Sequence, residues 1–386
     1  MTTLKILICL IVLSFAPQAF AAAQAFPSAP STIDLVVKEA IGRSLIAGGI
    51  VLVGNRDGIL FERAYGKVST LPDAPFTDSE TIFDLASLTK VFATAPSVLK
   101  LAEEGRLSLL DPIIKWYPEL AGHGKDQIKI LNLLTHTSGL DDFSLSAGDA
   151  LGSAIRGVAD QKLKGEVGNR FRYADINFIL LAEIVRRATG APLDVYAQAS
   201  FYRPLAMTDT GFRPARRLRC AVTFSEEGPR IGEPQDSQCR QLGGVAGHAG
   251  LFSTARDLSR FCRMILSGGV LDGKRVLQER TVAQMSVPYY SRRGQVARGL
   301  GWDIDSPYSA PRGTGFSRIS FGHTGYSGSS VWIDPAADTF VILLTTRLDY
   351  AHVREFNRLR SEISTVASAV YGSQTGVKDA RPSHDE

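Results

Sequence analysis

The stretch from Thr81 to Thr94, TIFDLASLTKVFAT, marks the point where an extended apolar segment turns into a helix. Ser87 and Lys90 stand three residues apart at this turn, so they share one face of the helix. A serine at a helix N-terminus lies in a positive field that favours an oxyanion, and a desolvated lysine can act as a base. The stretch predicts a nucleophile with its amine; the simpler alternative is a helix cap with a solvated lysine.

The same spacing recurs a few residues later in Ser97–Lys100, SVLK. Ser97 falls inside a helical pattern, directly after Pro96, and no extended segment leads into it. The spacing alone therefore does not identify a catalytic serine, and we interpret Ser97 as a structural residue.

Apolar patterning on both sides of the opening stretch predicts one α+β domain over residues 31–371. Two apolar runs around NRDG predict a β-hairpin before Ser87, and further runs with strand character follow residue 298. The segment between them is mostly helical with long loops. We expect an antiparallel sheet built from residues 48–86 and 298–348, flanked by helices, with a helical insertion at about 106–288.

The two ends of the chain have different compositions. Residues 1–21 combine Lys5, a short apolar run and small residues at Ala19–Ala21, which is typical of a cleaved export signal. The alternative is an uncleaved anchor. We expect a periplasmic or secreted protein with no membrane span after cleavage, and a polar, disordered tail at 373–386.

Composition excludes some partners. The net charge is only +4 over 386 residues, and no basic run stands out, so we do not expect nucleic-acid binding. No CxxC, HExxH or close His/Cys cluster occurs, so we expect neither a metal nor a cofactor. Cys220 and Cys239 flank a polar, turn-rich segment and predict a disulfide, whereas Cys262 fits a buried free thiol. A small-molecule or peptidoglycan-type substrate and a monomeric state are expected.

Two further stretches carry polar residues that suit the same chemistry. In FRYADINFILLAEI, Tyr173 stands just before a helix, where its hydroxyl can relay a proton between a lysine and a serine. In FGHTGYSGSSVWID, a strand carries His323 and Thr324 and then Gly325, which lets a substrate lie alongside as an added strand. The backbone amide of Tyr326 can form an oxyanion hole with that of the nucleophile.

The order S-x-x-K, Y-x-[N/D], [K/H]-T-G resembles that of the penicillin-recognising serine hydrolases. Within this superfamily, the chain most resembles the group that contains class C β-lactamases, DD-peptidases of the same fold and related esterases. The resemblance covers residues 31–371 and includes four supporting stretches: LNLLTHTSGL, YADINFILLAEIV, GGVAGHAGLFSTARDLSRF and FGHTGYSGSSVWIDP. It implies that Ser87 is acylated, that Lys90 and Tyr173 share the proton transfers, and that His323 and Thr324 line the substrate strand.

The sequence departs from this family pattern at two positions. His323 stands where β-lactamases of the group usually have lysine, which weakens the fixed charge for a substrate carboxylate and disfavours a dedicated β-lactamase. Asp175 stands where asparagine is usual. A carboxylate there is expected to keep Lys90 protonated, which favours Tyr173 as the base, although the choice between Lys90 and Tyr173 stays open.

Three further residues have two interpretations each. A hairpin around DPAAD would place Arg347 opposite Gly325 and Tyr326, as a carboxylate clamp; the alternative is an arginine at the surface end of a strand. We expect structural roles for His136 and His248; the alternatives are a catalytic role for His136 and, for His248, a place in a flexible glycine-rich wall of the site.

The function that fits these observations is an exported serine hydrolase that forms an acyl-enzyme and acts on a small carboxylic ester or a D-Ala-D-Ala-type peptide. The alternatives are a class C-like β-lactamase and a non-catalytic penicillin-binding or cell-wall scaffold protein. A standard α/β-hydrolase is disfavoured, because no G-x-S-x-G motif is found.

Overall fold

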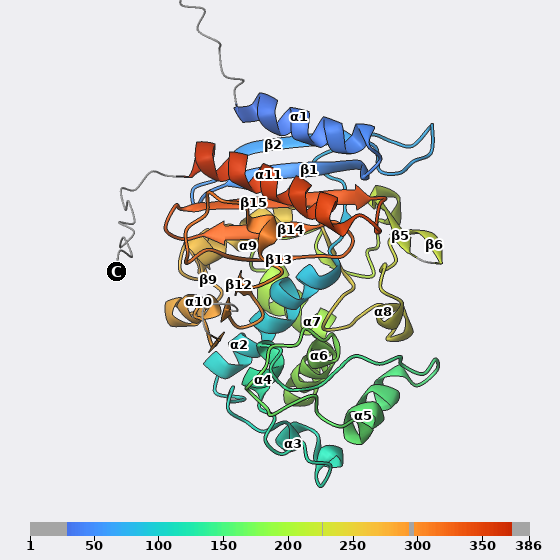
Figure 1. The fold of residues 1–386 in the computed structure, drawn as a ribbon. Coiled ribbons are helices and arrows are strands. Elements are labelled where there is room, and N and C mark those ends of the chain that lie inside the picture. Colours follow the sequence, from blue (N-terminus) through green and yellow to red (C-terminus); the bar gives the residue numbers. More distant parts are fainter. Residues whose placement is uncertain (1–28, 226, 293–296, 373–386) are drawn as a thin grey trace, which may run out of the picture.

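The computed structural model describes residues 29–225, 227–292 and 297–372 (Figure 1). The expected export signal at 1–21 and the expected tail at 373–386 lie outside these residues. Among the described residues, no helix has both the length and the apolar character needed to cross a membrane.

An eight-stranded antiparallel sheet forms the centre of the fold, in the order β10-β11-β12-β13-β14-β15-β1-β2. The first strands of the chain thus pair with the last ones, with Ile50 of β1 opposite Leu344 of β15. The α+β architecture expected from the sequence is confirmed. The strands are β1 (Ile46–Gly54), β2 (Ile59–Gly66), β10 (Tyr290–Ser291), β11 (Ala297–Arg298), β12 (Asp303–Asp305), β13 (Phe321–Thr324), β14 (Ser330–Asp334) and β15 (Thr339–Arg347).

Helices cover both faces of this sheet. Successive residues of a strand point to opposite sides, and apolar side chains on both sides need to be buried. Val51 and Val53 of β1 pack into one cluster with α1 (Ala29–Gly42) and α11 (Val353–Tyr371), which lie over the same face (Figure 1). Ile50 and Leu52 point the other way, into the large core that contains α9 (Ala255–Leu266) and the inserted helices. The sheet is therefore buried on both sides.

The inserted helices form a second layer below the sheet, and, apart from α8, their apolar faces join the same large core (Figure 1). The clearest of them, α6 (Ile176–Thr189), ends at Gly190, whose φ of 77° allows the left-handed stop that the sequence predicts. The others are α2 (Ala95–Glu103), α3 (Ile113–Trp116), α4 (Ile130–Leu134), α5 (Ala150–Asp160), α7 (Leu193–Ala197), α8 (Ser237–Gln241) and α10 (Glu279–Met285).

The segment that leads into Ser87 belongs to a separate small sheet. We expected the central sheet to extend to residue 86, but β3 (Phe83–Asp84) pairs with β7 (Leu251–Ser253), which also pairs with β4 (Gly211–Phe212). This small sheet places the start of the nucleophile turn against the segment that follows His248. Two further two-stranded sheets are β5 (Val222–Ser225) with β6 (Gly228–Ile231), and β8 (Val270–Leu271) with β9 (Lys274–Arg275).

The predicted Cys220–Cys239 disulfide is wrong. Both residues are buried free thiols, as is Cys262. Cys220 packs with Ile82 and Phe252, whereas Cys239 belongs to another small cluster, where its thiol donates to the carbonyl oxygen of Ala249 at 3.3 Å. The chain between the two cysteines forms the β5–β6 hairpin and the start of α8, and this structure carries the two side chains into separate clusters.

Candidate active site

The backbone at Ser87 is held in an unusual conformation. Ala86, directly before it, has a φ of +45°, a left-handed conformation that costs a residue with a side chain about 1–2 kcal/mol. Asp84 holds this turn, because its Oδ1 accepts a hydrogen bond from the Ala86 amide at 2.9 Å. Such strain is concentrated at functional sites in proteins. The chain then continues through a π-helical turn, Lys90–Thr94, into α2, and Pro96 falls in the first turn of α2.

The structure brings Ser87, Lys90 and Tyr173 together. Lys90 Nζ lies 2.9 Å from Ser87 Oγ, and the Tyr173 hydroxyl donates to the same oxygen at 3.0 Å. The lysine Nζ also lies 5.0 Å from the centre of the tyrosine ring. Both side chains thus lie within hydrogen-bond reach of the serine oxygen, where they can take part in proton transfers to and from it. Ser97, which has the same sequence spacing, instead donates to the carbonyl of Ala93 within its helix.

The Lys90 side chain is completely buried, and its Nζ makes two hydrogen bonds and one ion pair. The partners are Ser87 Oγ, the carbonyl oxygen of His248 at 3.2 Å and Asp175 Oδ1 at 2.7 Å. Burial alone would lower the pKa of Lys90, but the Asp175 carboxylate and Tyr173 reverse this effect and the pKa is raised. The amine beside the nucleophile is therefore an ammonium, which is the effect of Asp175 that the sequence predicts.

Tyr173 is also protonated in the resting site. Burial raises the pKa of its phenol, and the nearby Lys90 ammonium offsets this effect only in part. A free tyrosinate is therefore not the resting form near neutral pH. Neither neighbour is therefore a ready base for Ser87 in the resting site.

Asp142, which we did not single out from the sequence, and Asn177, which stands in the same stretch as Tyr173, hold these groups in place. The Asp142 carboxylate caps α6 by accepting from the amides of Asp175 at 3.0 Å and Ile176 at 2.9 Å. Asp175 therefore does not cap its own helix, and its carboxylate pairs with Lys90. Asn177 Oδ1 accepts a hydrogen bond from Ser138 at 2.6 Å. The sequence gives no recognisable signal for the capping role of Asp142, the second aspartate in GLDDF, because the helix that it caps starts more than thirty residues later.

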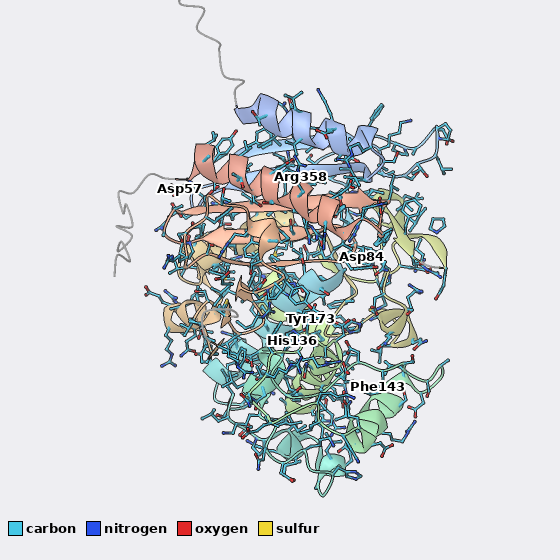
Figure 2. The ribbon with its side chains drawn as sticks, viewed as in Figure 1. Asp57, Asp84, His136, Phe143, Tyr173 and Arg358 are labelled. Carbon is cyan, nitrogen blue, oxygen red and sulfur yellow. The ribbon has the colours of Figure 1, made fainter. Side chains whose placement is uncertain are left out.

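His136 supports the tyrosine from below. The two rings stack with their centres 4.5 Å apart, and both lie between the sheet and the inserted helices (Figure 2). His136 Nδ1 accepts from the Ala174 amide at 3.2 Å, and burial lowers the pKa of the imidazole well below its usual value. A neutral, buried ring thus fixes the orientation of Tyr173, in line with the structural role that we expected for it.

A cavity of about 220 Å³ opens above Ser87. Of the predicted catalytic and substrate-binding residues, Lys90 and Asp175 do not line it; Lys90 contacts Ser87 from the buried side, and Asp175 lies beside Lys90. A larger hollow of about 560 Å³ lies between α5, α6 and residues 241–247, and Ser87 is not part of its wall. The smaller cavity is lined by Ser87, Tyr173, Arg298, Asp303, Tyr308, His323, Thr324, Gly325, Tyr326, Arg347, Val353, Asn357 and Arg360.

The end of β13 forms one wall of this cavity. His323 Nδ1 lies 2.8 Å from the Thr324 carbonyl, which can only accept, so Nδ1 carries the proton. Burial lowers the pKa of His323 well below its usual value, with further lowering by Arg298 and Lys90. The ring is therefore neutral and supplies no charge for a substrate. At Gly325, a Cβ would lie 2.3 Å from the Leu85 carbonyl, so only glycine allows this strand to approach the nucleophile turn.

The Tyr326 amide is available for an oxyanion. Within the described part of the chain it donates to no acceptor, whereas the neighbouring Gly325 amide donates to the Ser329 carbonyl at 2.8 Å. A free backbone donor at the wall of a cavity that also contains the nucleophile is the arrangement an oxyanion hole requires.

Two buried arginines supply positive charge to the cavity. Arg347 Nη1 donates to the Tyr326 carbonyl at 3.0 Å, which matches the predicted register, and its Nη2 is buried without a partner among the described residues. Arg360 Nη2 donates to the carbonyls of Gly325 and Ser329, at 2.6 and 2.9 Å. Within the described chain, neither arginine pairs with a carboxylate, unlike Arg298, which pairs with an aspartate at 3.0 Å.

Arg360 was missed in the sequence, although a signal was present. It stands four residues after Phe356 and three before Ile363, so it occupies a position in the apolar stripe of α11. A charged residue at such a position is buried with its helix, and burial lowers the pKa of Arg360 to about 9. Charged residues are rarely buried without a partner, so this position indicates a functional group.

Comparisons with known proteins agree with this site. A family model described as Beta-lactamase matches residues 33–363. An Escherichia coli (strain K12) protein named "Putative D-alanyl-D-alanine carboxypeptidase" is 28% identical over 339 residues, which cover 77% of each chain. A Salmonella agona (strain SL483) protein of the same name is 27% identical over 345 residues, covering 77% of this chain and 78% of the relative.

Two solved structures share the fold. EstCE1, a hydrolase with promiscuous acyltransferase activity, superposes with a TM-score of 0.73 at 21% identity, covering 87% of this chain and 98% of its own. A class C beta lactamase gives a TM-score of 0.72 at 18% identity, covering 89% and 98%. The chain belongs to the beta-lactamase family of serine hydrolases, and the resemblance inferred from its three motifs is confirmed.

Proposed function

We propose that the protein is an exported hydrolase, periplasmic or secreted, that acts through an acyl-enzyme on Ser87. The substrate is an ester or amide that carries a carboxylate, such as a D-Ala-D-Ala-type peptide or a small acidic ester. The observation that carries this proposal is the convergence of Lys90 Nζ at 2.9 Å and the Tyr173 hydroxyl at 3.0 Å on the serine oxygen, at a cavity wall.

In the proposed reaction, Ser87 Oγ attacks the substrate carbonyl while its proton passes to the Tyr173 oxygen. Tyr173 gives its own proton to the leaving amine or alcohol, so no free base is needed beforehand. Because the Tyr173 proton leaves before the serine proton has fully arrived, partial negative charge develops on the tyrosine oxygen, and the Lys90 ammonium stabilises it. Water then attacks the acyl carbonyl, its proton returns through Tyr173, and Ser87 is restored.

The amides of Ser87 and Tyr326 stabilise the tetrahedral oxyanion in this proposal. The Tyr326 amide has no competing acceptor among the described residues, which supports this role. Loss of one oxyanion donor typically slows an enzyme by about 100- to 1000-fold.

Arg347 and Arg360 favour an acidic substrate. Both line the cavity with Ser87, and His323 contributes no charge, so the guanidinium groups are the cations left to receive a carboxylate. The names of the curated relatives point to the same substrate class, since a D-Ala-D-Ala peptide ends in a carboxylate. A β-lactam carries a carboxylate as well, so β-lactamase action is the second candidate.

Covalent labelling tests the proposal. A fluorophosphonate and a fluorescent penicillin are each incubated with the protein, and the labelled peptide is identified by mass spectrometry. We expect label on Ser87 that disappears in Ser87→Ala. Ser97→Ala is the matched control, because Ser97 has the same S-x-x-K spacing but points into its own helix, and it should label normally.

A panel of substrates then separates the candidates: a D-Ala-D-Ala peptide, the same peptide amidated at its C-terminus, a neutral ester and a β-lactam. Hydrolysis of the free-acid peptide in preference to its amide supports a carboxypeptidase. No label with either probe would contradict the acyl-enzyme and favour a binding or scaffold protein.

A further inference from the structure

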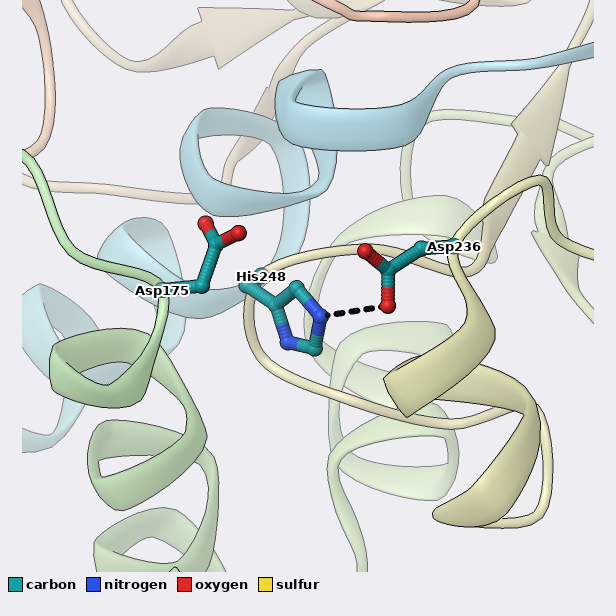
Figure 3. A group of neighbouring side chains, drawn as sticks. All are labelled: Asp175, Asp236 and His248. Carbon is teal, nitrogen blue, oxygen red and sulfur yellow. Dashed lines mark hydrogen bonds and ion pairs between the residues drawn. The ribbon is translucent and has the colours of Figure 1, made fainter. Parts of the chain in front are cut away.

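The segment from 234 to 250 closes the site behind Lys90. His248 contributes twice, because its carbonyl oxygen accepts from Lys90 Nζ at 3.2 Å and its imidazole Nε2 lies 2.9 Å from Asp236 Oδ1 (Figure 3). The side chain is only 2% exposed. Its other ring nitrogen, Nδ1, is buried without a partner among the described residues, so Asp236 is the one side chain there that hydrogen-bonds the ring.

Asp236 is itself fixed at two points. Its Oδ1 accepts from the Cys239 amide at 2.7 Å and caps α8. The amide of the preceding residue, Gln235, donates at 2.7 Å to Oδ2 of Asp84, whose other oxygen holds the strained Ala86. A continuous path of bonds therefore runs from the nucleophile turn through Asp84 and Asp236 to His248 and back to Lys90.

His248 lies near acidic groups on two sides. The His248 ring faces Asp236 on one side, and Asp175 and Lys90 lie nearby. Burial would lower the pKa of His248, but the two aspartates raise it, and the imidazole in turn holds the pKa of Asp236 below its usual value. The ring is thus bound to Asp236 by a charge-assisted hydrogen bond, which is stronger than a neutral one.

We propose that His248 is a positioning residue: its bond to Asp236 fixes the carbonyl that receives one of the three donors of the Lys90 ammonium, and so keeps Nζ directed at Ser87 Oγ. The inference rests on the proposed function, because it assigns a role within the Ser87 reaction. Without the bond between His248 and Asp236, the His248 carbonyl is free to move, and Lys90 Nζ loses one of the three contacts that orient it.

A cation site is the other interpretation of this cluster. One ligand atom from each of Asp175, Asp236 and His248 lies within 4.8 Å of the others. However, the Lys90 ammonium already lies 2.7 Å from Asp175 Oδ1 and takes the place of a cation. A divalent ion beside that ammonium would meet strong repulsion, so we interpret the cluster as a network of ion pairs.

The test compares two substitutions at His248. His248→Leu keeps the volume and removes the bond to Asp236, whereas His248→Gln keeps an amide donor near the position of Nε2 and removes the charge. We expect His248→Leu to lower kcat by about 10- to 100-fold, since misplacement by about 1 Å can cost that much. KM should stay within about twofold of the wild-type value, because His248 does not line the cavity. His248→Gln should recover most of the rate.

Three measurements make the outcome decisive. His352→Gln is the matched control, because His352 also contacts an aspartate, at 2.6 Å, but is 64% exposed, and it should leave kcat unchanged. Thermal unfolding verifies that each variant folds; if His248→Leu does not fold, Asp236→Ala removes the same bond from the other side. The inference would be overturned by a wild-type kcat in the variant that lacks the bond, or by a His248→Gln variant as slow as His248→Leu. Either result would leave the proposed function standing. A wild-type protein that no probe labels would overturn the proposed function and this inference with it.

Discussion

Lys90 Nζ lies 2.7 Å from Asp175 Oδ1, and this ion pair determines the charge of the amine that touches the nucleophile. The lysine is completely buried, which by itself would favour the neutral amine. Because the carboxylate reverses that preference, the proposed reaction uses Lys90 as a fixed positive charge and Tyr173 as the group that moves protons.

The first prediction concerns Asp175→Asn. The substitution removes the carboxylate but not the burial, so the pKa of Lys90 falls and the ammonium loses its proton at lower pH. We expect the basic limb of the kcat/KM profile to move to lower pH by about 1–3 units. Asp141→Asn is the control, since Asp141 pairs with Arg172 and not with Lys90. An unmoved basic limb would show that the pair does not control the reaction.

The second prediction concerns stability and Asp84. Burial raises the pKa of its carboxyl to about 6, from 3.8 in the free residue, although the amides of Gln235 and Ala86 oppose the rise. The folded protein thus binds this proton more tightly than the unfolded chain does. The resulting stability is fully present below pH 3.8 and is lost as the pH rises through about 6.

Asp84→Asn removes this titration. We therefore expect the free energy of unfolding of the wild type to decrease relative to that of the variant, by up to about 3 kcal/mol, between pH 4 and pH 7. Denaturant unfolding of both proteins at several pH values measures the difference. Parallel stability curves would mean that Asp84 does not titrate in this range.

The third prediction concerns the two unpaired arginines. Arg360→Gln and Arg347→Gln should each lower kcat/KM by about 10- to 100-fold for a substrate with a carboxylate, because a hydrogen bond to a charged group contributes about 1.5–3 kcal/mol. Hydrolysis of a neutral ester should change little. The matched control is Arg358→Gln, on the same helix but exposed and paired with Glu362 (Figure 2). If the variants keep the wild-type kcat/KM on both substrates, or lose the same factor on both, the clamp is refuted.

The fourth prediction concerns metal ions. Because the Lys90 ammonium already pairs with Asp175, we expect dialysis against a chelator to leave the labelling rate of Ser87 unchanged, and added Zn²⁺ not to increase it. A chelator-sensitive rate that Zn²⁺ restores would instead assign the Asp175, Asp236 and His248 cluster to a metal.

Short motifs carried most of the information about this site. A strand that turns into a helix at Ser87, a tyrosine just before a helix, and a histidine, threonine and glycine on a strand each have a local signature. The structure places Ser87, Tyr173 and His323 around one cavity. The hairpin between β14 and β15 also follows from its turn, and with it the position of Arg347 beside Tyr326.

Other features depend on packing between distant segments, which a single sequence does not encode locally. The polar, turn-rich segment between Cys220 and Cys239 predicts a disulfide. The β5–β6 hairpin and α8 instead carry the two cysteines into different clusters. The role of β3 in the small sheet depends on a partner strand far along the chain. The place of Arg360 in the apolar stripe of α11 indicates a buried charge, but the sequence does not show that the packing of α11 brings this charge to the cavity.

The central claim is that Ser87 becomes acylated, and the most direct test is the intact mass of the protein during turnover. A slowly hydrolysed thioester analogue of a D-Ala-terminated peptide is mixed with the protein and quenched in acid within seconds. The account predicts a mass increase equal to the acyl group, located on Ser87, absent in Ser87→Ala and retained in Ser97→Ala. Turnover of the substrate by an enzyme that never carries the acyl group, or an acyl group on another residue, would contradict it.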